Sequence, residues 1–238
     1  MNVVARPCVV LLPGLLCDET VWRAQRAALA FAECVVPSYG ETDSLVAMAQ
    51  GVLQTLPPRF SLAGHSMGGR VALEIARMAP ERVERLALLD SGTDPAAQGA
   101  AGVQERDKRL ALLEIAQAQG MRAMGTQWAR GMVHANRLGT PLFDEILDMI
   151  GRRTPAVFSA QIHALLGRPD ANDVLAGMRC PVTLVCGRQD AWSPLDRHER
   201  MQAICPGSEL VVVEDSGHMS TIEQPAAVSR ALLDWMAR

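Results

Sequence analysis

The stretch "FSLAGHSMGGRVAL", residues 60–73, carries the strongest structural signal in the chain. An apolar run typical of a buried strand, residues 60–64, leads directly into a run with helical spacing, residues 67–78, and Ser66 stands at the corner. The pattern G-x-S-x-G arises by chance in roughly one chain in ten of this size, so its context matters. A strand that turns directly into a helix strains the corner residue and holds its side chain at the strand's carboxyl end, while flanking glycines let the two backbones pass closely. We therefore predict that Ser66 is a nucleophile; the alternative is a helix N-cap in a glycine-rich connection.

Other short apolar runs recur along the chain, and they indicate further strands. They are nearly continuous rather than alternating, as strands covered on both faces must be, so we expect a parallel sheet. The runs are residues 8–12, 34–36, 85–90, 182–187 and 209–214. Segments with helical spacing lie between them, at residues 21–31, 45–56, 195–204 and 226–236. This alternation predicts an α/β fold with a mostly parallel sheet of about six strands flanked by helices.

One long gap interrupts the alternation. Between Asp90 and Val182 no strand is evident, and the sequence shows helical patterns at residues 103–119, 121–133, 142–150 and 156–166. A loop of that length is implausible inside a compact domain, so we expect a structured insertion before the penultimate strand. We predict an α/β core at residues 1–94 and 177–238 and a helical cap, or lid, at residues 95–176.

A serine nucleophile needs a base within hydrogen-bond reach and a carboxylate that orients the base. Of the five histidines, His218 lies in "EDSGHMSTIEQP", the loop after the last strand, where a preceding glycine lets the loop fold over the sheet's carboxyl edge. Asp190 follows the penultimate strand in the setting "GRQDAWSP" and is the favoured acid. Asp90, at the end of the strand after the serine helix, remains a rival.

Acyl transfer also needs N–H donors that stabilise the oxyanion of the tetrahedral intermediate. Met67 offers one as the residue after the nucleophile. The loop after the first strand, "LLPGLLCDETVW", offers a second, which we assign to Leu15.

These features together resemble the α/β-hydrolase superfamily, in its small esterase-like serine hydrolase branch, and the likeness covers essentially the whole chain. It rests on the corner "GHSMGG", the acid in "GRQDAWSP", the histidine in "EDSGHMS" and the cap insertion. The resemblance implies the α/β-hydrolase fold and a catalytic triad in the chain order Ser66, Asp190, His218, with Leu15 and Met67 as the oxyanion hole. Where most members carry His-Gly at the oxyanion loop, this chain carries Pro13-Gly14.

Composition narrows the class of partner. The 238-residue chain has a formal net charge of −3, which gives no electrostatic reason to expect nucleic acid. Its six cysteines form no C-x-x-C pair, so we interpret them as reduced and buried. The apolar start of the chain is broken by Pro13 and Gly14, and no stretch reaches transmembrane length. We expect a cytoplasmic protein, monomeric or homodimeric, with no membrane partner, no metal and no cofactor.

The sequence thus predicts a serine hydrolase of the carboxylic ester class that cleaves a small, mostly apolar ester or related acyl compound through an acyl-enzyme. A C–C bond hydrolase, a cofactor-free perhydrolase or an acyltransferase could use the same triad, and a ligand-binding receptor with residual hydrolysis is a further alternative. The residues predicted to contact the small-molecule substrate are Leu16, Trp128, Trp192 and Met219. Arg122, Arg130 and His163 could bind a substrate carboxylate, but such cap residues are more typical of solvated surface.

Overall fold

The computed structural model describes residues 6–238. Its sheet has six strands, all parallel, in the order β2-β1-β3-β4-β5-β6. The strands are β1 (Cys8–Leu12), β2 (Glu33–Val35), β3 (Phe60–His65), β4 (Val83–Leu89), β5 (Val182–Gly187) and β6 (Glu209–Val213). The predicted α/β class with about six parallel strands is confirmed, and each expected strand is present within one or two residues of its predicted ends.

The continuous apolar runs are explained by the burial of the central strands. Every residue of β1, β3 and β5 is buried. Helices cover both faces of the sheet, so a strand in its middle has no side facing water, and neither side of it can be polar without cost. The edge strand β2 is only three residues long and partly exposed.

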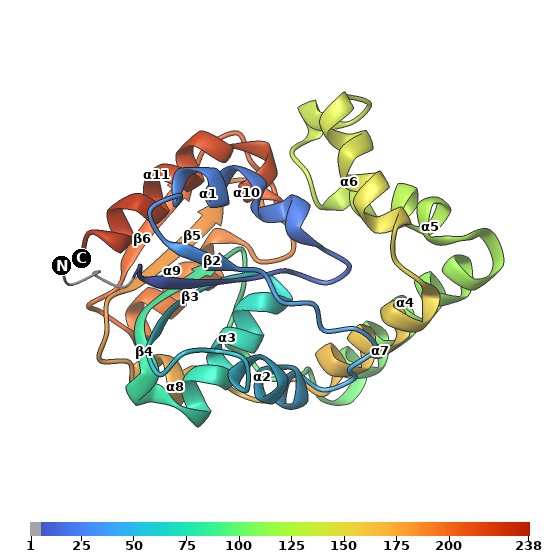
Figure 1. Cartoon of the computed structure of the whole chain (residues 1–238). Coiled ribbons are helices and arrows are strands. Elements are labelled where there is room, and N and C mark those ends of the chain that lie inside the picture. Colours follow the sequence, from blue (N-terminus) through green and yellow to red (C-terminus); the bar gives the residue numbers. More distant parts are fainter. Residues whose placement is uncertain (1–5) are drawn as a thin grey trace.

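Two groups of helices form the outer layers, one on each face of the sheet (Figure 1). On one face α11 (Pro225–Met236) packs against β4, β5 and β6, with α1 (Arg23–Ala28) and α10 (Ser220–Glu223) beside it. On the other, α3 (Met67–Met78) contacts β1, β3 and β4. Around α3 lie α2 (Leu45–Leu53), α8 (Asn172–Ala176) and α9 (Leu195–Ile204).

The helix expected at residues 21–31 is shorter than its periodicity indicated. A 3-10 turn at Glu19–Trp22 comes first, and α1 ends at Ala28. Asp18 Oδ1 accepts a hydrogen bond from the Thr20 N–H at 2.9 Å and caps the 3-10 turn. The local cap therefore sets a start that hydrophobic spacing does not reveal.

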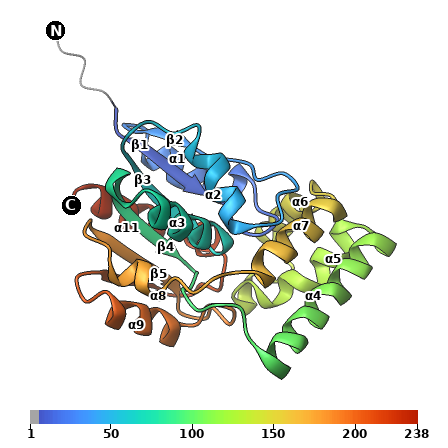
Figure 2. The ribbon, with the colours of Figure 1, turned by 90° about the horizontal axis from the view of Figure 1, so that it is seen from below.

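Between β4 and β5 the chain forms four longer helices, which we call the cap helices: α4 (Gly99–Gln119), α5 (Met121–Trp128), α6 (Pro141–Gly151) and α7 (Pro155–Leu166). Both ribbon views show them together to one side of the sheet (Figures 1 and 2). The short α8, which follows them, contacts α3 and α9 instead. The division into core and cap at residues 94 and 177 stays a prediction.

The cap helices are tied to the loop that follows β1. Gln161 Oε1 on α7 accepts a hydrogen bond from the Leu16 N–H at 2.8 Å. Arg152, just after α6, forms an ion pair with Asp18 at 2.7 Å, and Arg153 donates to the Cys17 carbonyl at 2.6 Å. These contacts hold the cap helices over the carboxyl edge of the sheet.

None of the helices in residues 6–238 is long and apolar enough to cross a membrane. All six cysteines are free thiols.

Candidate active site

Ser66 stands between β3 and α3 in a strained backbone conformation. Its φ is 52° and its ψ is −116°, a region that non-glycine residues rarely adopt. The Ser66 N–H donates to the Leu89 carbonyl at 2.8 Å, and the Ser91 hydroxyl donates to the Ser66 carbonyl at 2.8 Å. The end of β4 thus holds the corner in place. Between residues 60 and 76 Ser66 is the only residue that is not buried.

The corner requires glycine on both sides of the serine. A Cβ at Gly64 would lie 2.4 Å from the Gly68 carbonyl oxygen, and one at Gly68 would lie 2.1 Å from the Leu12 carbonyl oxygen. Real Cβ atoms do not approach backbone so closely, so β3, α3 and β1 can meet only if both positions lack a side chain. This packing is the physical reason for the G-x-S-x-G spacing.

Ser66, His218 and Asp190 form a continuous chain of hydrogen bonds. His218 Nε2 lies 2.8 Å from Ser66 Oγ, and His218 Nδ1 lies 2.8 Å from Asp190 Oδ2. The other carboxylate oxygen, Asp190 Oδ1, accepts hydrogen bonds from the N–H groups of Trp192 at 2.8 Å and Ser193 at 2.9 Å. The structure therefore brings together three predicted residues from three different loops.

The electrostatics of this chain suit an imidazole base. Burial opposes a charge on His218, but the Asp190 carboxylate outweighs it, so the pKa of His218 is raised above its ordinary value of 6.5. Burial alone would raise the pKa of Asp190, but its contacts with His218 and two backbone N–H groups lower it. Asp190 is thus ionised at neutral pH, and its charge favours the protonated form of His218.

The rival acid, Asp90, has a different environment. Its Oδ1 accepts a hydrogen bond from the Gly187 N–H at 2.9 Å, and its Oδ2 lies against the Ser220 hydroxyl. Burial, together with the charge of Asp190, raises the pKa of Asp90 to about 8. Asp90 therefore keeps its proton at neutral pH and makes no hydrogen bond to His218.

Three groups that were not predicted from the sequence hold the loop that carries His218. His65 Nε2 lies 2.8 Å from the His218 carbonyl oxygen, so it donates this hydrogen bond, and the His218 N–H donates to the Met132 carbonyl at 2.6 Å. Burial lowers the pKa of His65 to about 4, which keeps this imidazole neutral. Adjacent side chains at a corner diverge, so His65 points away from Ser66 and toward the His218 loop.

Glu223 is the third anchor. Its Oε1 accepts hydrogen bonds from the N–H groups of Gly217 at 3.0 Å and Met219 at 3.2 Å. Its Oε2 accepts one from the His134 N–H at 2.7 Å, in the segment between α5 and α6. One buried carboxyl group therefore joins the His218 loop to the cap segment. The only signal in the sequence was a carboxylate five residues after the histidine.

The two expected oxyanion donors lie beside Ser66. Met67 is the first residue of α3, so its N–H is at the helix N-terminus. A Cβ at Gly14 would lie 3.2 Å from Ser66 Cβ, so the backbone just before Leu15 contacts the serine directly. Leu15 and Met67 both line the cavity that contains Ser66.

That cavity has a volume of about 640 Å³ and also contains His218. Trp128 and Trp192 line it, with their ring centroids 5.1 Å apart and their planes tilted by 35°. That these two residues contact substrate stays a prediction. Leu16 and Met219 do not line it: both side chains are 0% exposed and belong to the hydrophobic core. The expectation that these two residues contact substrate is corrected, because the turn after β1 points Leu16 inward and the His218 loop packs Met219 beneath it.

The charged residues of this cavity were not predicted from the sequence. Its lining includes five basic residues and two acidic ones, namely Arg70, Lys108, Arg109, Arg168, Arg197, Asp94 and Glu105. The basic residues that the sequence did suggest lie elsewhere: Arg122 pairs with Asp144 and Asp148 on the exposed side of the cap helices. In the sequence only Arg70 indicated a charge near the serine, because it lies four residues after Ser66, in the first turn of α3.

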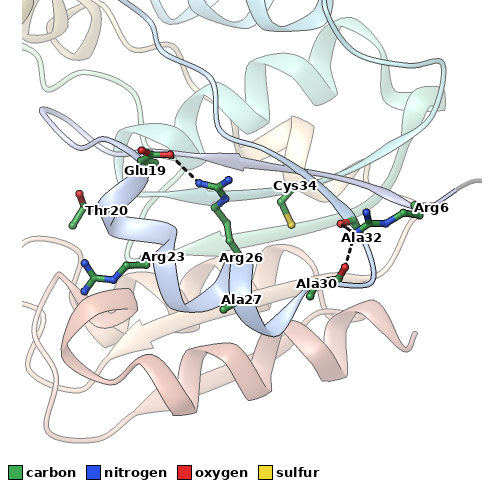
Figure 3. Close-up of a pocket in the computed structure, with 9 residues that line it drawn as sticks. All are labelled: Arg6, Glu19, Thr20, Arg23, Arg26, Ala27, Ala30, Ala32 and Cys34. Atoms are coloured by element: carbon green, nitrogen blue, oxygen red, sulfur yellow. Dashed lines mark hydrogen bonds and ion pairs between the residues drawn. The ribbon is translucent and has the colours of Figure 1, made fainter.

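A second cavity, also of about 640 Å³, lies beside α1 and β2 (Figure 3). Its arginines already have partners: Arg26 pairs with Glu19, Arg23 with Glu145, and Arg6 donates to backbone carbonyls of residues 30–32. This cavity contains neither Ser66 nor His218.

Comparison with known proteins gives a family. A model described as "Alpha/beta hydrolase family" matches residues 9–231. The chain is 28% identical to the pimeloyl-[acyl-carrier protein] methyl ester esterase of Klebsiella pneumoniae, over 94% of this chain and 91% of that protein. It is also 28% identical to RutD of Variovorax paradoxus, whose name suggests carbamate hydrolysis, over 97% and 91% of the two chains.

Solved structures agree with the family match. A thermophilic esterase from Thermogutta terrifontis superposes with a TM-score of 0.87 at 26% identity, over 98% of this chain and 90% of the esterase. The enol-lactonase of Burkholderia xenovorans has a TM-score of 0.85 at 19% identity, over 100% and 94% of the two chains, a likeness of fold alone. The α/β-hydrolase fold predicted from the sequence is confirmed.

Proposed function

The chain belongs to the alpha/beta hydrolase family, and we propose that it is a serine hydrolase that cleaves a small carboxylic ester through an acyl-enzyme. The proposal rests above all on the hydrogen-bonded chain from Asp190 through His218 to Ser66, with both distances at 2.8 Å. A serine in this arrangement has a base at its hydroxyl and a carboxylate behind the base, the two aids that a hydroxyl needs to attack a carbonyl.

In the proposed first step, His218 Nε2 takes the proton of Ser66 as Oγ attacks the ester carbonyl. Asp190 holds the imidazole in the tautomer that exposes a lone pair to Ser66 and then stabilises the imidazolium. His218 next gives its proton to the departing alcohol, which leaves the acyl group on Ser66. Water, activated by His218 in the same way, releases the acid and restores the hydroxyl.

The negative charge of the tetrahedral intermediate would lie between the N–H groups of Leu15 and Met67. Preorganised donors of this kind are typically worth about 3 to 4 kcal/mol each in the transition state. The contact of Gly14 with Ser66 supports Leu15 as the second donor, because it brings the next peptide group to the serine.

The volume and the lining of the cavity support a small substrate. A volume of about 640 Å³ lies within the range of small-molecule sites. One part of the lining is apolar, formed by Leu112, Trp128, Met132, Leu165 and Trp192. The names of the methyl ester esterase and of RutD support cleavage of an ester or a related acyl bond in this chain as well.

The proposal can be tested with a fluorophosphonate probe and a panel of short-chain aryl esters. We expect the probe to label Ser66 and the esters to be hydrolysed, and we expect both to disappear in Ser66→Ala. Ser229→Ala is the matched control, because Ser229 lies on α11 and does not line the cavity. Labelling in Ser66→Ala at the wild-type level, or equal loss in both variants, would contradict the proposal.

A further inference from the structure

The basic residues of the Ser66 cavity are not balanced by acidic ones. Five cationic side chains and two carboxylates line it, whereas the chain as a whole has a net charge of −3. A local excess of positive charge inside an acidic protein attracts anionic ligands into the cleft.

Glu105 forms ion pairs with two of these five cations, Arg168 and Arg109. Its two carboxylate oxygens accept hydrogen bonds from both terminal nitrogens of Arg168, each at 2.8 Å. Glu105 Oε1 also accepts from Arg109 Nη2 at 2.9 Å. Arg168 and Arg109 therefore share a single carboxylate. Of the other three cations, Lys108 is exposed to solvent, and Arg70 and Arg197 are the less exposed ones.

Arg70 is a buried cation with few hydrogen-bond partners. Its residue is 8% exposed, and among residues 6–238 its guanidinium donates only to the Asp94 carbonyl. Burial, with the like charges of Arg168 and Arg197, lowers the pKa of Arg70 to about 9, so it is still a cation at neutral pH. A buried cation without a carboxylate is costly unless a ligand completes its contacts.

Arg197, beside Arg70, also has a buried N–H group that lacks a hydrogen-bond acceptor. Its Nη1 donates to the Trp192 carbonyl at 3.1 Å and to Ser193 Oγ at 3.4 Å. Its Nε is buried and has no hydrogen-bond partner within the described residues: Asp94 Oδ2 forms an ion pair with it, but the 3.8 Å separation is too long for a hydrogen bond. A buried N–H of a charged group that lacks an acceptor marks a place where one is missing.

The two guanidinium groups converge at Gly92. A Cβ on Gly92 would lie 2.7 Å from Arg197 Cδ, 3.2 Å from Arg70 Nη2 and 3.5 Å from Arg197 Nε. Arg70 Nη2 and Arg197 Nε thus lie close to each other beside Gly92, and all three residues line the same cavity as Ser66. Arg70 is one helical turn, about 5.4 Å of axis, beyond the serine corner.

We propose that Arg70 and Arg197 form an anion subsite, so that the substrate of this enzyme is an ester that carries a carboxylate a few bonds from the scissile carbonyl. The inference rests on the proposed ester hydrolysis at Ser66. A planar carboxylate fits the paired N–H groups of guanidinium ions. Asp94 and Glu105 in the same lining would oppose the double charge that a phosphate monoester places on a single group, which favours a carboxylate group, with one charge, at this subsite.

The test compares matched esters that differ in charge. One pair is 4-nitrophenyl hemiglutarate and 4-nitrophenyl valerate, with the carboxylate on the acyl side; the other is 4-acetoxybenzoate and phenyl acetate, with it on the alcohol side. We expect wild type to prefer the anionic ester in at least one pair. That preference, as a ratio of kcat/KM values, should fall by roughly 10- to 100-fold in Arg197→Gln, the loss of one hydrogen bond to a charged group.

Two further variants separate recognition from general damage. Gly92→Ala keeps both charges but displaces Arg197, and it should lower the same ratio. Arg122→Gln removes a positive charge from the exposed side of the cap helices and should leave the ratio unchanged. Arg70→Lys, which retains a cation at the buried position, should keep more of the preference than Arg197→Gln.

Glutarate binding to Ser66→Ala, measured by calorimetry, tests the subsite even if no ester is cleaved. We expect glutarate to bind, dimethyl glutarate to bind at least tenfold more weakly, and glutarate binding to be lost when Arg197→Gln is added. Failure of Ser66 labelling with intact glutarate binding would overturn the hydrolase and not the subsite. Equal turnover of both esters in each pair, with no glutarate binding, would overturn the subsite and leave the hydrolase standing.

Discussion

The two buried aspartates near His218 give a sharp test of the proposed mechanism, through the isosteric variants Asp190→Asn and Asp90→Asn. In Asp190 one oxygen accepts from two backbone N–H groups, at 2.8 and 2.9 Å. An asparagine must keep its carbonyl oxygen there, so its NH₂ group would occupy the position that faces His218 Nδ1. This NH₂ group can only donate, which forces the proton of His218 onto Nε2, opposite Ser66 Oγ.

An imidazole in that tautomer cannot accept the serine proton. For the serine protease triad the equivalent change costs about 10⁴-fold in kcat, or roughly 5 kcal/mol of barrier, and we expect a loss of that order in Asp190→Asn. In Asp90→Asn the carbonyl oxygen can still accept from the Gly187 N–H, and the NH₂ group can donate to the Ser220 hydroxyl. Because Asp90 is already neutral at pH 7, we expect kcat to change by less than roughly threefold, under about 1 kcal/mol.

The assay is the release of 4-nitrophenolate from 4-nitrophenyl butyrate at several pH values, with circular dichroism to confirm that both variants fold. An Asp190→Asn variant that keeps more than about a tenth of the wild-type kcat would rule out Asp190 as the carboxylate that orients His218. If Asp90→Asn is the inactive variant instead, the acid is on the other strand.

Three further predictions concern the base, its loop and the serine corner. Because the pKa of His218 is raised and only its neutral form accepts a proton, kcat/KM should fall as the pH drops through a midpoint above 6.5; a rate profile that stays flat to pH 4 would exclude His218 as the base. Glu223→Gln places an NH₂ group against a backbone N–H and should destabilise the fold by about 1 to 3 kcal/mol in urea unfolding, whereas Glu199→Gln on the exposed side of α9 should change it by less than about 0.5 kcal/mol. An effect of equal size in the two variants would remove the bridging role of Glu223. Gly64→Ala should prevent folding or abolish activity, because its Cβ would lie 2.4 Å from a backbone oxygen. Gly51→Ala is the control: Gly51 lies within α2, a Cβ there would have no atom within 4 Å, and the change should raise the free energy of unfolding by about 0.5 to 1 kcal/mol. A folded, active Gly64→Ala variant would contradict the close packing of the corner.

The elements of the core could be predicted because their signals are local. Continuous apolar runs identify strands that are covered on both faces, and the spacing of Gly64, Ser66 and Gly68 identifies a corner that only small residues allow. The ends were less certain, because they depend on single hydrogen bonds. The Asp18 cap, for example, starts a 3-10 turn where periodicity indicated a helix.

The substrate cavity was predicted less well. Trp128 and Trp192 line it, but Leu16 and Met219 are buried in the core, because a loop's apolar residues can point toward either the cavity or the interior. Sequence spacing does not distinguish these orientations. The charged side of the cavity was also missed, since Arg70 and Arg197 are distant in the chain and meet only across Gly92.

The sequence by itself determined the parallel α/β core and which serine, histidine and aspartates reach its carboxyl edge, because strand burial and tight corners depend on neighbours along the chain. Only the tertiary structure decided that Asp190 contacts His218 while Asp90 stays protonated apart from it, and that two arginines converge beside the serine. The physical reason is that loop paths and side-chain packing set the distances between strand ends. Those distances, not residue types, decide which charges interact.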